Sequence, residues 1–222
     1  QLFSFKRGSM RAIRLHRLVQ VLWLLPLFLL LLITNNIALT IDWILFPKFK
    51  KQEIKNPIFI ASLPRTGTTN LLHSLTSINS TFSAMSLWEI ILAPSIIQKK
   101  TYRLFWFYSP FFLKKVVKYF DKIIFKKLNN LHRISFLKKE EDEMIMMWAL
   151  ASAYMSFFYP ESHVMRDLFR FEMGDISEKR KFRIIKIYHR MVQRHLYALG
   201  EDTIKRFLSK NPSMAARVET IS

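Results

Sequence analysis

A short apolar run, a glycine-containing loop and a helical segment limit the fold of this chain more than any other feature. Residues 57–61, with the sequence PIFIA, have the length and composition of a buried parallel strand. Residues 71–76 read as a helix, and residues 62–69 between them have the sequence SLPRTGTT. Such a unit directs backbone N–H groups and the positive end of a helix at the loop, where phosphate or sulfate binds. The segment therefore predicts an α/β domain with an anion-binding loop.

The loop contains the side chains that an anion site needs. Gly67 lets the backbone approach a ligand closely, and Arg65 adds a planar, permanently charged guanidinium. Thr68 and Thr69 add hydroxyl donors. A Walker A loop would have glycine at Ser62 and lysine at Thr68, so the sequence argues against an ATPase or GTPase. Another P-loop transferase, such as a nucleotide-dependent kinase, stays an alternative.

A second strand–loop–helix unit begins near the end of the sequence. Residues 204–209 read as a strand, and Asn211 and Pro212 follow as a helix cap and a first helical residue. Lys210 stands between that strand and that helix. Side chains at the ends of parallel strands meet in one crevice, so we expect Lys210 to face the same crevice as Arg65.

These motifs resemble those of the sulfotransferase family, strongest for the bacterial-type branch that includes the tyrosylprotein sulfotransferases. Members carry a P-[KR]-[ST]-G-T-T loop, and the likeness extends to residues 87–89 (LWE), 140–143 (EEDE) and 207–212 (FLSKNP). It covers roughly residues 56–92 and 140–222. The resemblance implies a P-loop-like three-layer α/β domain with a parallel sheet. It also implies that the loop binds the 5′-phosphosulfate of 3′-phosphoadenosine-5′-phosphosulfate (PAPS) through Pro64, Arg65, Thr66, Gly67, Thr68, Thr69 and Asn70.

The resemblance further implies a reaction and two catalytic residues. The sulfonyl group of PAPS would pass in line to a hydroxyl or amine acceptor, and no metal is expected. Glu89 matches the catalytic glutamate of the tyrosylprotein branch, at a somewhat longer spacing from the loop, and would be the base. Lys210 matches the lysine of an N-K-D-P segment, with Asn211 in place of the aspartate. A 3′-phosphate site is implied beyond Ser222, so we expect the C-terminal part of the domain to be missing.

The acidic run at residues 140–143 receives no catalytic role at this point. It opens a predicted helix that extends to about residue 158, and acidic residues in a first turn suit the helix dipole. A further helix is predicted from Glu178 to Leu199, capped by Ser177 and closed by Gly200.

An uncharged stretch precedes the catalytic domain. No charged residue occurs from Leu18 to Ile41, which is long enough to cross a bilayer core of ~30 Å. We therefore divide the chain into a basic segment (1–17), a membrane-anchoring segment (18–45) and the sulfotransferase domain (55–222). A helix buried against the domain is the second interpretation. A half-embedded anchor with the domain on the cytoplasmic face suits a bacterial enzyme, and a type II Golgi membrane protein is the alternative.

A cationic aromatic segment, residues 99–139, is predicted as a helical insertion. Apolar residues recur at helical spacing from Phe111 to Leu131, and five lysines fall on the other side: Lys114, Lys115, Lys118, Lys122 and Lys126. The pattern indicates a helix that rests on lipid headgroups, or a solvated lysine face over a core-facing stripe.

The composition narrows the partners. A formal net charge of +19 fits an anionic membrane surface, and we expect no nucleic acid because the basic residues lie among apolar and aromatic runs. The absence of cysteine excludes disulfides, thiolate chemistry and cysteine-ligated zinc. A lipid-linked or membrane-proximal acceptor is therefore expected. A basic membrane-surface protein with an idle loop and no enzyme activity is the competing hypothesis.

Overall fold

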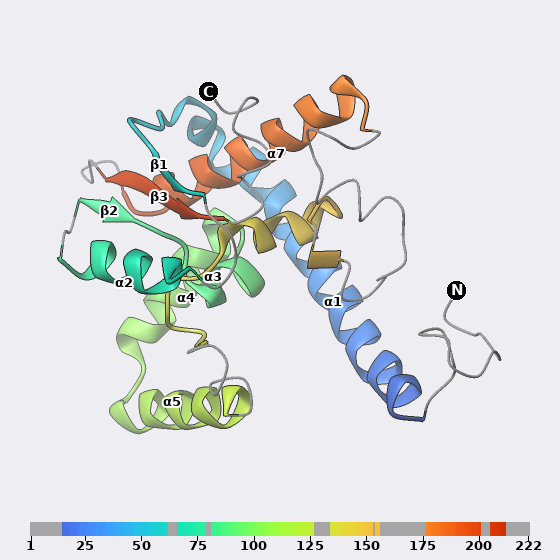
Figure 1. The fold of residues 1–222 in the computed structure, drawn as a ribbon. Helices are drawn as coiled ribbons and strands as arrows, with labels where there is room; N and C mark the ends of the chain where they lie inside the picture. The colour runs from blue at the N-terminus through green and yellow to red at the C-terminus, as the bar shows by residue number, and fades with distance from the viewer. Residues whose placement is uncertain are drawn as a thin grey trace.

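A computed structural model describes residues 15–61, 66–78, 81–126, 134–152, 154–155, 176–200 and 205–211, with side chains from Leu22 onward (Figure 1). Pro64, Arg65 and Pro212 lie outside the described residues. The predictions for these three residues therefore stay predictions.

A small parallel sheet forms the centre of the domain. Its strands are β1 (Ile58–Ile60), β2 (Phe82–Ser83) and β3 (Arg206–Lys210), in the order β1-β3-β2, with both pairs parallel. The register places Ile60 opposite Lys210. The structure confirms a mixed helix and strand domain with a parallel sheet. The sequence did not predict β2, because two residues are too short to form an apolar run.

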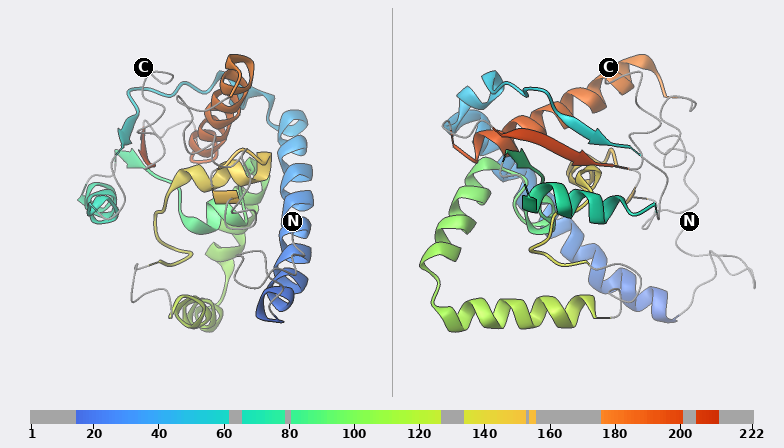
Figure 2. Two further views of the ribbon diagram at one scale, coloured as in Figure 1. Left: turned by 45° about the vertical axis from the view of Figure 1, so that its right-hand side comes forward. Right: turned by 60° about the vertical axis from the view of Figure 1, so that its left-hand side comes forward.

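The two faces of the sheet are covered by different helices (Figure 2). Phe207 packs with the buried residues of α7 (Glu178–Tyr197) and the 3₁₀ helix η2 (Asp142–Ala149), whereas Leu208 packs with Leu72 of α2 (Thr68–Ile78). Successive side chains of a strand point to opposite faces, and this alternation divides the core into two layers. The predicted helices after β1 and from Glu178 are confirmed.

The helix predicted from residue 140 to about 158 has a different form in the structure. The described helix is η2, a 3₁₀ helix that ends at Ala149, and Leu150 follows it with a φ of 53° in the left-handed region. The physical reason is the burial of Asp142. Its carboxylate accepts a hydrogen bond from the backbone N–H of Lys210 on β3, whereas the prediction placed it on an exposed first turn. Residues 156–175 lie outside the described part of the chain.

Helix α1 (Leu15–Leu45) is continuous through Pro26, and its C-terminal half is docked on the domain by polar side chains. The Asn36 amide donates to the Trp148 carbonyl at 3.0 Å. The Asp42 carboxylate accepts from the backbone N–H groups of Ile96 and Ile97 and from Arg194 at distances from 2.8 to 3.1 Å. The polar residues that interrupt the apolar run are therefore docking residues.

The N-terminal half of α1 extends away from the domain (Figure 1). Among the described residues, one helical stretch, Leu22–Leu45, is long and apolar enough to cross a membrane, and 17% of it is buried. Membrane anchors and signal sequences share this length and composition. The division of the chain at residues 17, 45 and 55 stays a prediction.

Helices α3 (Leu87–Ile91), α4 (Ile96–Tyr108) and α5 (Phe111–Phe125) connect β2 to η2, and a short 3₁₀ helix η1 (Pro47–Lys51) follows α1. The predicted cationic helix begins at Phe111 as expected, and the description of α5 ends at Phe125. The views in Figures 1 and 2 place α5 at the same end of the molecule as the N-terminal part of α1, away from the sheet.

Candidate active site

The first turn of α2 forms one wall of the site. Gly67 has a φ of 82°, a conformation that residues other than glycine rarely adopt, and beyond its chain neighbours no described residue has an atom within 4 Å of where its Cβ would stand. The Gly67 carbonyl accepts from the Asn70 N–H at 3.0 Å and starts the helix. Thr66 and Gly67 are exposed, and Thr68 and Thr69 are half-buried. This open, positively polarised helix end fits an anionic group.

Lys210 lies directly beside this helix end. Its ammonium group donates to the Thr69 hydroxyl at 3.0 Å, and its side chain is 6% exposed. The pairing of β1 with β3 explains the contact, because α2 follows β1 and Lys210 ends β3 at the same edge of the sheet. The backbone N–H of Asn211 continues the pairing by donating to the Ile60 carbonyl at 3.2 Å.

The acidic run at the start of η2 completes the cluster around Lys210. Glu141 accepts from the Lys210 ammonium group through Oε1 at 2.6 Å, and its Oε2 accepts from the Tyr154 hydroxyl. Glu140 is 9% exposed, and burial raises its pKa to about 7 against the lowering effect of Lys210. The site therefore combines one ammonium group with two neighbouring carboxyl groups.

Asp142 fixes the end of β3 through hydrogen bonds to Ser209 and Lys210. Its carboxylate accepts from the Ser209 hydroxyl at 2.9 and 3.0 Å, from the Lys210 N–H at 3.2 Å and from the Tyr188 hydroxyl. Burial raises the pKa of Asp142 to about 6, although the hydrogen bonds from Tyr188 and Ser209 lower it. These contacts hold the backbone from which the Lys210 side chain projects.

Glu89, the predicted base, lies in a different environment. It is 1% exposed, and its Oε2 accepts from the backbone N–H and the hydroxyl of Ser86, both at 2.8 Å. Its Oε1 accepts from Arg103 at 2.7 Å, in an ion pair. Glu89 is the third residue of α3 and returns to its N-cap, which is a capping-box arrangement. The role of base for Glu89 stays a prediction.

Further basic residues surround Glu89. Lys139 Nζ lies 3.8 Å from its carboxylate and His195 Nδ1 lies 3.7 Å away. Burial alone would raise the pKa of Glu89, but the cationic surroundings and the Ser86 N–H hold that pKa well below its usual range. Burial lowers the pKa of Lys99 to about 8 and that of His195 to about 3. Glu89 is therefore ionised, and the imidazole of His195 is neutral at pH 7.

The structure brings together Lys210 and Thr69 among the predicted site residues. Among the contacts of the described residues, none joins Glu89 to either of them. Sequence reasoning missed Glu141 and Asp142, although the four-residue acidic run was a visible signal. Its explanation by the helix dipole was local, whereas the observed contacts of both residues reach β3.

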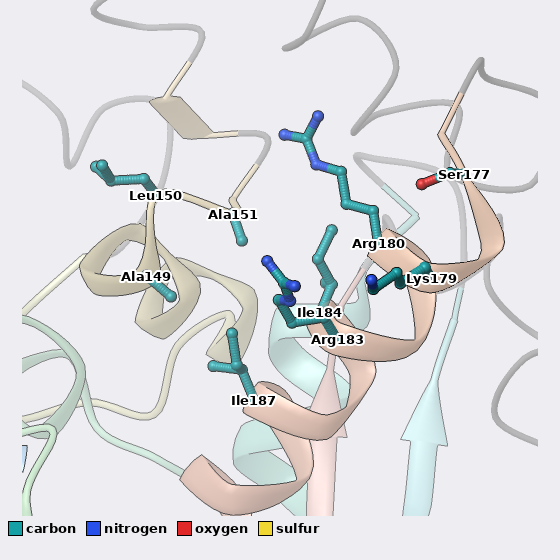
Figure 3. Close-up of a pocket in the computed structure, with 9 residues that line it drawn as sticks. All are labelled: Ala149, Leu150, Ala151, Ser177, Lys179, Arg180, Arg183, Ile184 and Ile187. Atoms are coloured by element: carbon teal, nitrogen blue, oxygen red, sulfur yellow. The ribbon is translucent and has the colours of Figure 1, made fainter.

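A pocket of about 420 Å³ opens beyond the C-terminal end of η2 (Figure 3). Apolar side chains from η2 and α7 line it together with three basic residues of α7: Lys179, Arg180 and Arg183. Within the described residues, no group of three or more His, Asp or Glu side chains is placed to hold a metal ion.

The chain is similar to the crystal structure of sulfotransferase STF9 from Mycobacterium avium, with a TM-score of 0.50 and 15% sequence identity over 83% of this chain. At this identity the likeness shows the fold alone, which is a sulfotransferase-like α/β fold. The chain spans 44% of the length of STF9. No protein-family model and no curated protein matches the sequence.

Proposed function

We propose that this protein transfers a sulfonyl group from PAPS to a hydroxyl or amine acceptor. One observation carries the proposal most directly: the Lys210 ammonium group lies 3.0 Å from the Thr69 hydroxyl at the N-terminus of α2. A cation at a helix N-terminus that also has a glycine at a φ of 82° forms a site for a doubly anionic group. The sulfotransferase-like fold and the family motifs of the loop support a sulfated nucleotide as that group.

The proposed donor site uses the loop and the first turn of α2. The backbone N–H groups of that turn and the Thr68 and Thr69 hydroxyls would hold the 5′-phosphosulfate, with the Arg65 guanidinium beside it. Pro64, Thr66, Gly67 and Asn70 complete the set that the family motif proposes. PAPS supplies the activated sulfonyl group when it is bound.

The chemistry that this site would perform resembles phosphoryl transfer. The acceptor oxygen or nitrogen forms a bond to sulfur while the bond from sulfur to the 5′-phosphate oxygen breaks. The negative charge then develops on that phosphate oxygen, and adenosine 3′,5′-bisphosphate leaves. Lys210 would stabilise this charge, and the helix end would align the donor.

A binding experiment with two glycine variants tests the donor site. Gly67 and Gly200 both have positive φ, 82° and 107°, and both have open space where a Cβ would stand. We expect Gly67→Ala in the full-length protein to weaken binding of adenosine 3′,5′-bisphosphate about tenfold, because the strain of about 1–2 kcal/mol falls on the binding loop. Gly200→Ala introduces the same backbone strain away from the site and should leave the affinity unchanged.

The same titration separates the proposal from its competitors. A sulfotransferase binds adenosine 3′,5′-bisphosphate more tightly than ATP, whereas a kinase would show the reverse order. A basic membrane protein with an idle loop would bind neither nucleotide. Either of these two results would reject sulfonyl transfer as the function.

The membrane is the second element of the proposal. Along α5 most apolar side chains are exposed, Phe112 at 67% and Ile124 at 57% among them, and four lysines lie on the other side of the helix: Lys114, Lys115, Lys118 and Lys122. A helix of this kind lies in an anionic membrane interface with its apolar face in the lipid. Because α5 and the N-terminal part of α1 lie at one end of the molecule, both would contact the same bilayer (Figure 2). The proposed acceptor is therefore lipid-linked or membrane-proximal, and the proposed location is the cytoplasmic face.

Vesicle binding tests this second element. We expect the double variant Lys115→Glu/Lys122→Glu to bind vesicles containing phosphatidylglycerol at least about tenfold more weakly, since each lysine contributes about 1 kcal/mol. Lys51→Glu/Lys55→Glu changes the charge equally at two exposed residues near the other end of α1 and should have little effect. Equal losses in both variants would show that net charge, and not α5, determines the binding.

A further inference from the structure

We propose that Glu141, and not Glu89, accepts the proton of the acceptor during the transfer. This inference rests on the proposed function, because it assigns a residue to that reaction. The assignment comes from the place of Glu141 in the site and from its accessibility.

The geometry places Glu141 beside the group that defines the donor site. Its Oε1 lies 2.6 Å from Lys210 Nζ, which in turn lies 3.0 Å from Thr69 Oγ1. A single ammonium group therefore separates the carboxylate from the helix end where the sulfate would be held. A general base has to lie within hydrogen-bond reach of the proton it removes, and this position satisfies the condition for an acceptor that approaches the sulfur.

The exposure of the two carboxylates also differs. The side chain of Glu141 is 18% exposed, whereas that of Glu89 is 2% exposed. An acceptor can reach the first carboxylate from solvent. It could reach the second only if α3 moved, because Ser86 and Arg103 occupy both oxygens of Glu89.

The surroundings of Glu141 fit a proton acceptor with a fixed position. The groups that face it are Lys210 on β3, the Tyr154 hydroxyl, and Glu140 on its own segment, and Asp142 follows it at the start of η2. Tyr154 holds Oε2, so Oε1 is the oxygen that Lys210 now occupies and that the acceptor proton would take. Burial raises the pKa of the adjacent Glu140 to about 7, against the lowering effect of Lys210.

The proposed step balances in atoms and charge. As the sulfate group binds, the Lys210 ammonium is shared with its oxygens. The acceptor O–H bond then breaks, its proton passes to Glu141 Oε1, and the acceptor oxygen bonds to sulfur. The bond between sulfur and the 5′-phosphate oxygen breaks, and its electron pair leaves on that oxygen beside Lys210. Glu141 then releases its proton to water through its exposed part.

The experiment compares three carboxamide variants of the full-length protein. Glu141→Gln removes the proposed base, Glu89→Gln alters the buried cluster, and Glu53→Gln is a matched control whose side chain is 71% exposed. For each we measure kcat against pH, the affinity for adenosine 3′,5′-bisphosphate, and the melting temperature. We expect Glu141→Gln to lower kcat by about 10²–10⁴-fold and to lose the acidic limb of the pH profile. Its affinity for the bisphosphate should be equal or higher, because Lys210 loses a competing partner.

Two results would overturn the assignment. If Glu89→Gln loses turnover with normal melting and normal nucleotide affinity, Glu89 is the base. If Glu141→Gln loses nucleotide affinity together with turnover, Glu141 only positions Lys210. The variant Glu141→Asp distinguishes a folding defect from a loss of chemistry. Its carboxylate is shorter but can still accept a proton, so we expect a reduced kcat and a pH profile that keeps its acidic limb. Failure of the wild-type protein to bind the bisphosphate would instead reject the proposed function itself.

Discussion

Among the described residues, the surroundings of Glu89 and those of Glu141 differ in what their charges face. The cluster around Glu89 is closed: the carboxylate bonds to the start of its own helix, and Arg103 and Lys139 surround it. The cluster around Glu141 is open, because Lys210 connects it to the exposed first turn of α2. A carboxylate such as Glu89, whose two oxygens are both held by protein groups, stabilises the fold. A carboxylate such as Glu141, paired with a cation at a ligand site, can exchange that partner during a reaction. The difference predicts that substitutions in the two clusters have different effects.

Replacement of Lys210 should have the largest effect, and that effect should fall on turnover. We expect Lys210→Ala to lower kcat by about 10²–10³-fold, the usual result of removing one group that stabilises developing charge. The control is Lys55→Ala, at a lysine whose side chain is 70% exposed. Steady-state kinetics with PAPS check the prediction. A variant with normal kcat would remove Lys210 from the reaction and leave the open cluster without a function.

Replacement of Glu89 should affect stability. We expect Glu89→Ala to lower the free energy of unfolding by about 3 kcal/mol, because it leaves cationic groups buried without their partner and removes a helix cap. Urea denaturation measures this quantity. Glu53→Ala, which breaks only an exposed ion pair with Lys55, should change it by less than about 1 kcal/mol. Equal stability of the two variants would contradict the closed character of the Glu89 cluster.

The smallest effect is expected at Glu140, and it depends on pH. The pKa of Glu140 is raised from 4.5 to about 7 in the folded protein, so folding takes up a proton between these values. The native state therefore loses stability as pH rises from about 4.5 to 7, by at most about 3 kcal/mol. Glu140→Gln removes this loss, and we expect it to be more stable than the wild type by about 1–2 kcal/mol at pH 8 and equal at pH 4.

Denaturation curves at the two pH values check this expectation. A gain that is the same at both values would show that the carboxyl group of Glu140 titrates normally. Burial would then not raise the pKa of Glu140.

Local patterns in the sequence predicted the parts of the fold that depend on neighbouring residues. The apolar run at β1, the glycine that starts α2 and the strand before Lys210 are visible within a few residues each. The sequence predicted from the ends of parallel strands that Lys210 faces the crevice of Arg65. Arg65 lies outside the described residues, and the described contact of Lys210 is with Thr69 of the same loop–helix unit.

The remaining contacts could not be predicted because they depend on register between distant segments. Glu141 is separated from Lys210 by 69 positions, and the hydrogen bonds of Asp142 with Ser209 and with the Lys210 N–H hold the start of η2 against the end of β3. Likewise, Asp42 directly follows the uncharged stretch of residues 18–41, and in the structure it caps α4 and pairs with Arg194 across 152 positions. A charged residue at the end of such a stretch gives no indication of its partner until the tertiary structure is known.

A crystal structure of the full-length protein with adenosine 3′,5′-bisphosphate would test the central claim most directly. The account predicts that the 5′-phosphate lies at the first turn of α2, within hydrogen-bond distance of Lys210 Nζ, with Glu141 facing the vacant sulfonyl position. A bisphosphate bound elsewhere, with Lys210 still paired only to Glu141 and Thr69, would contradict it.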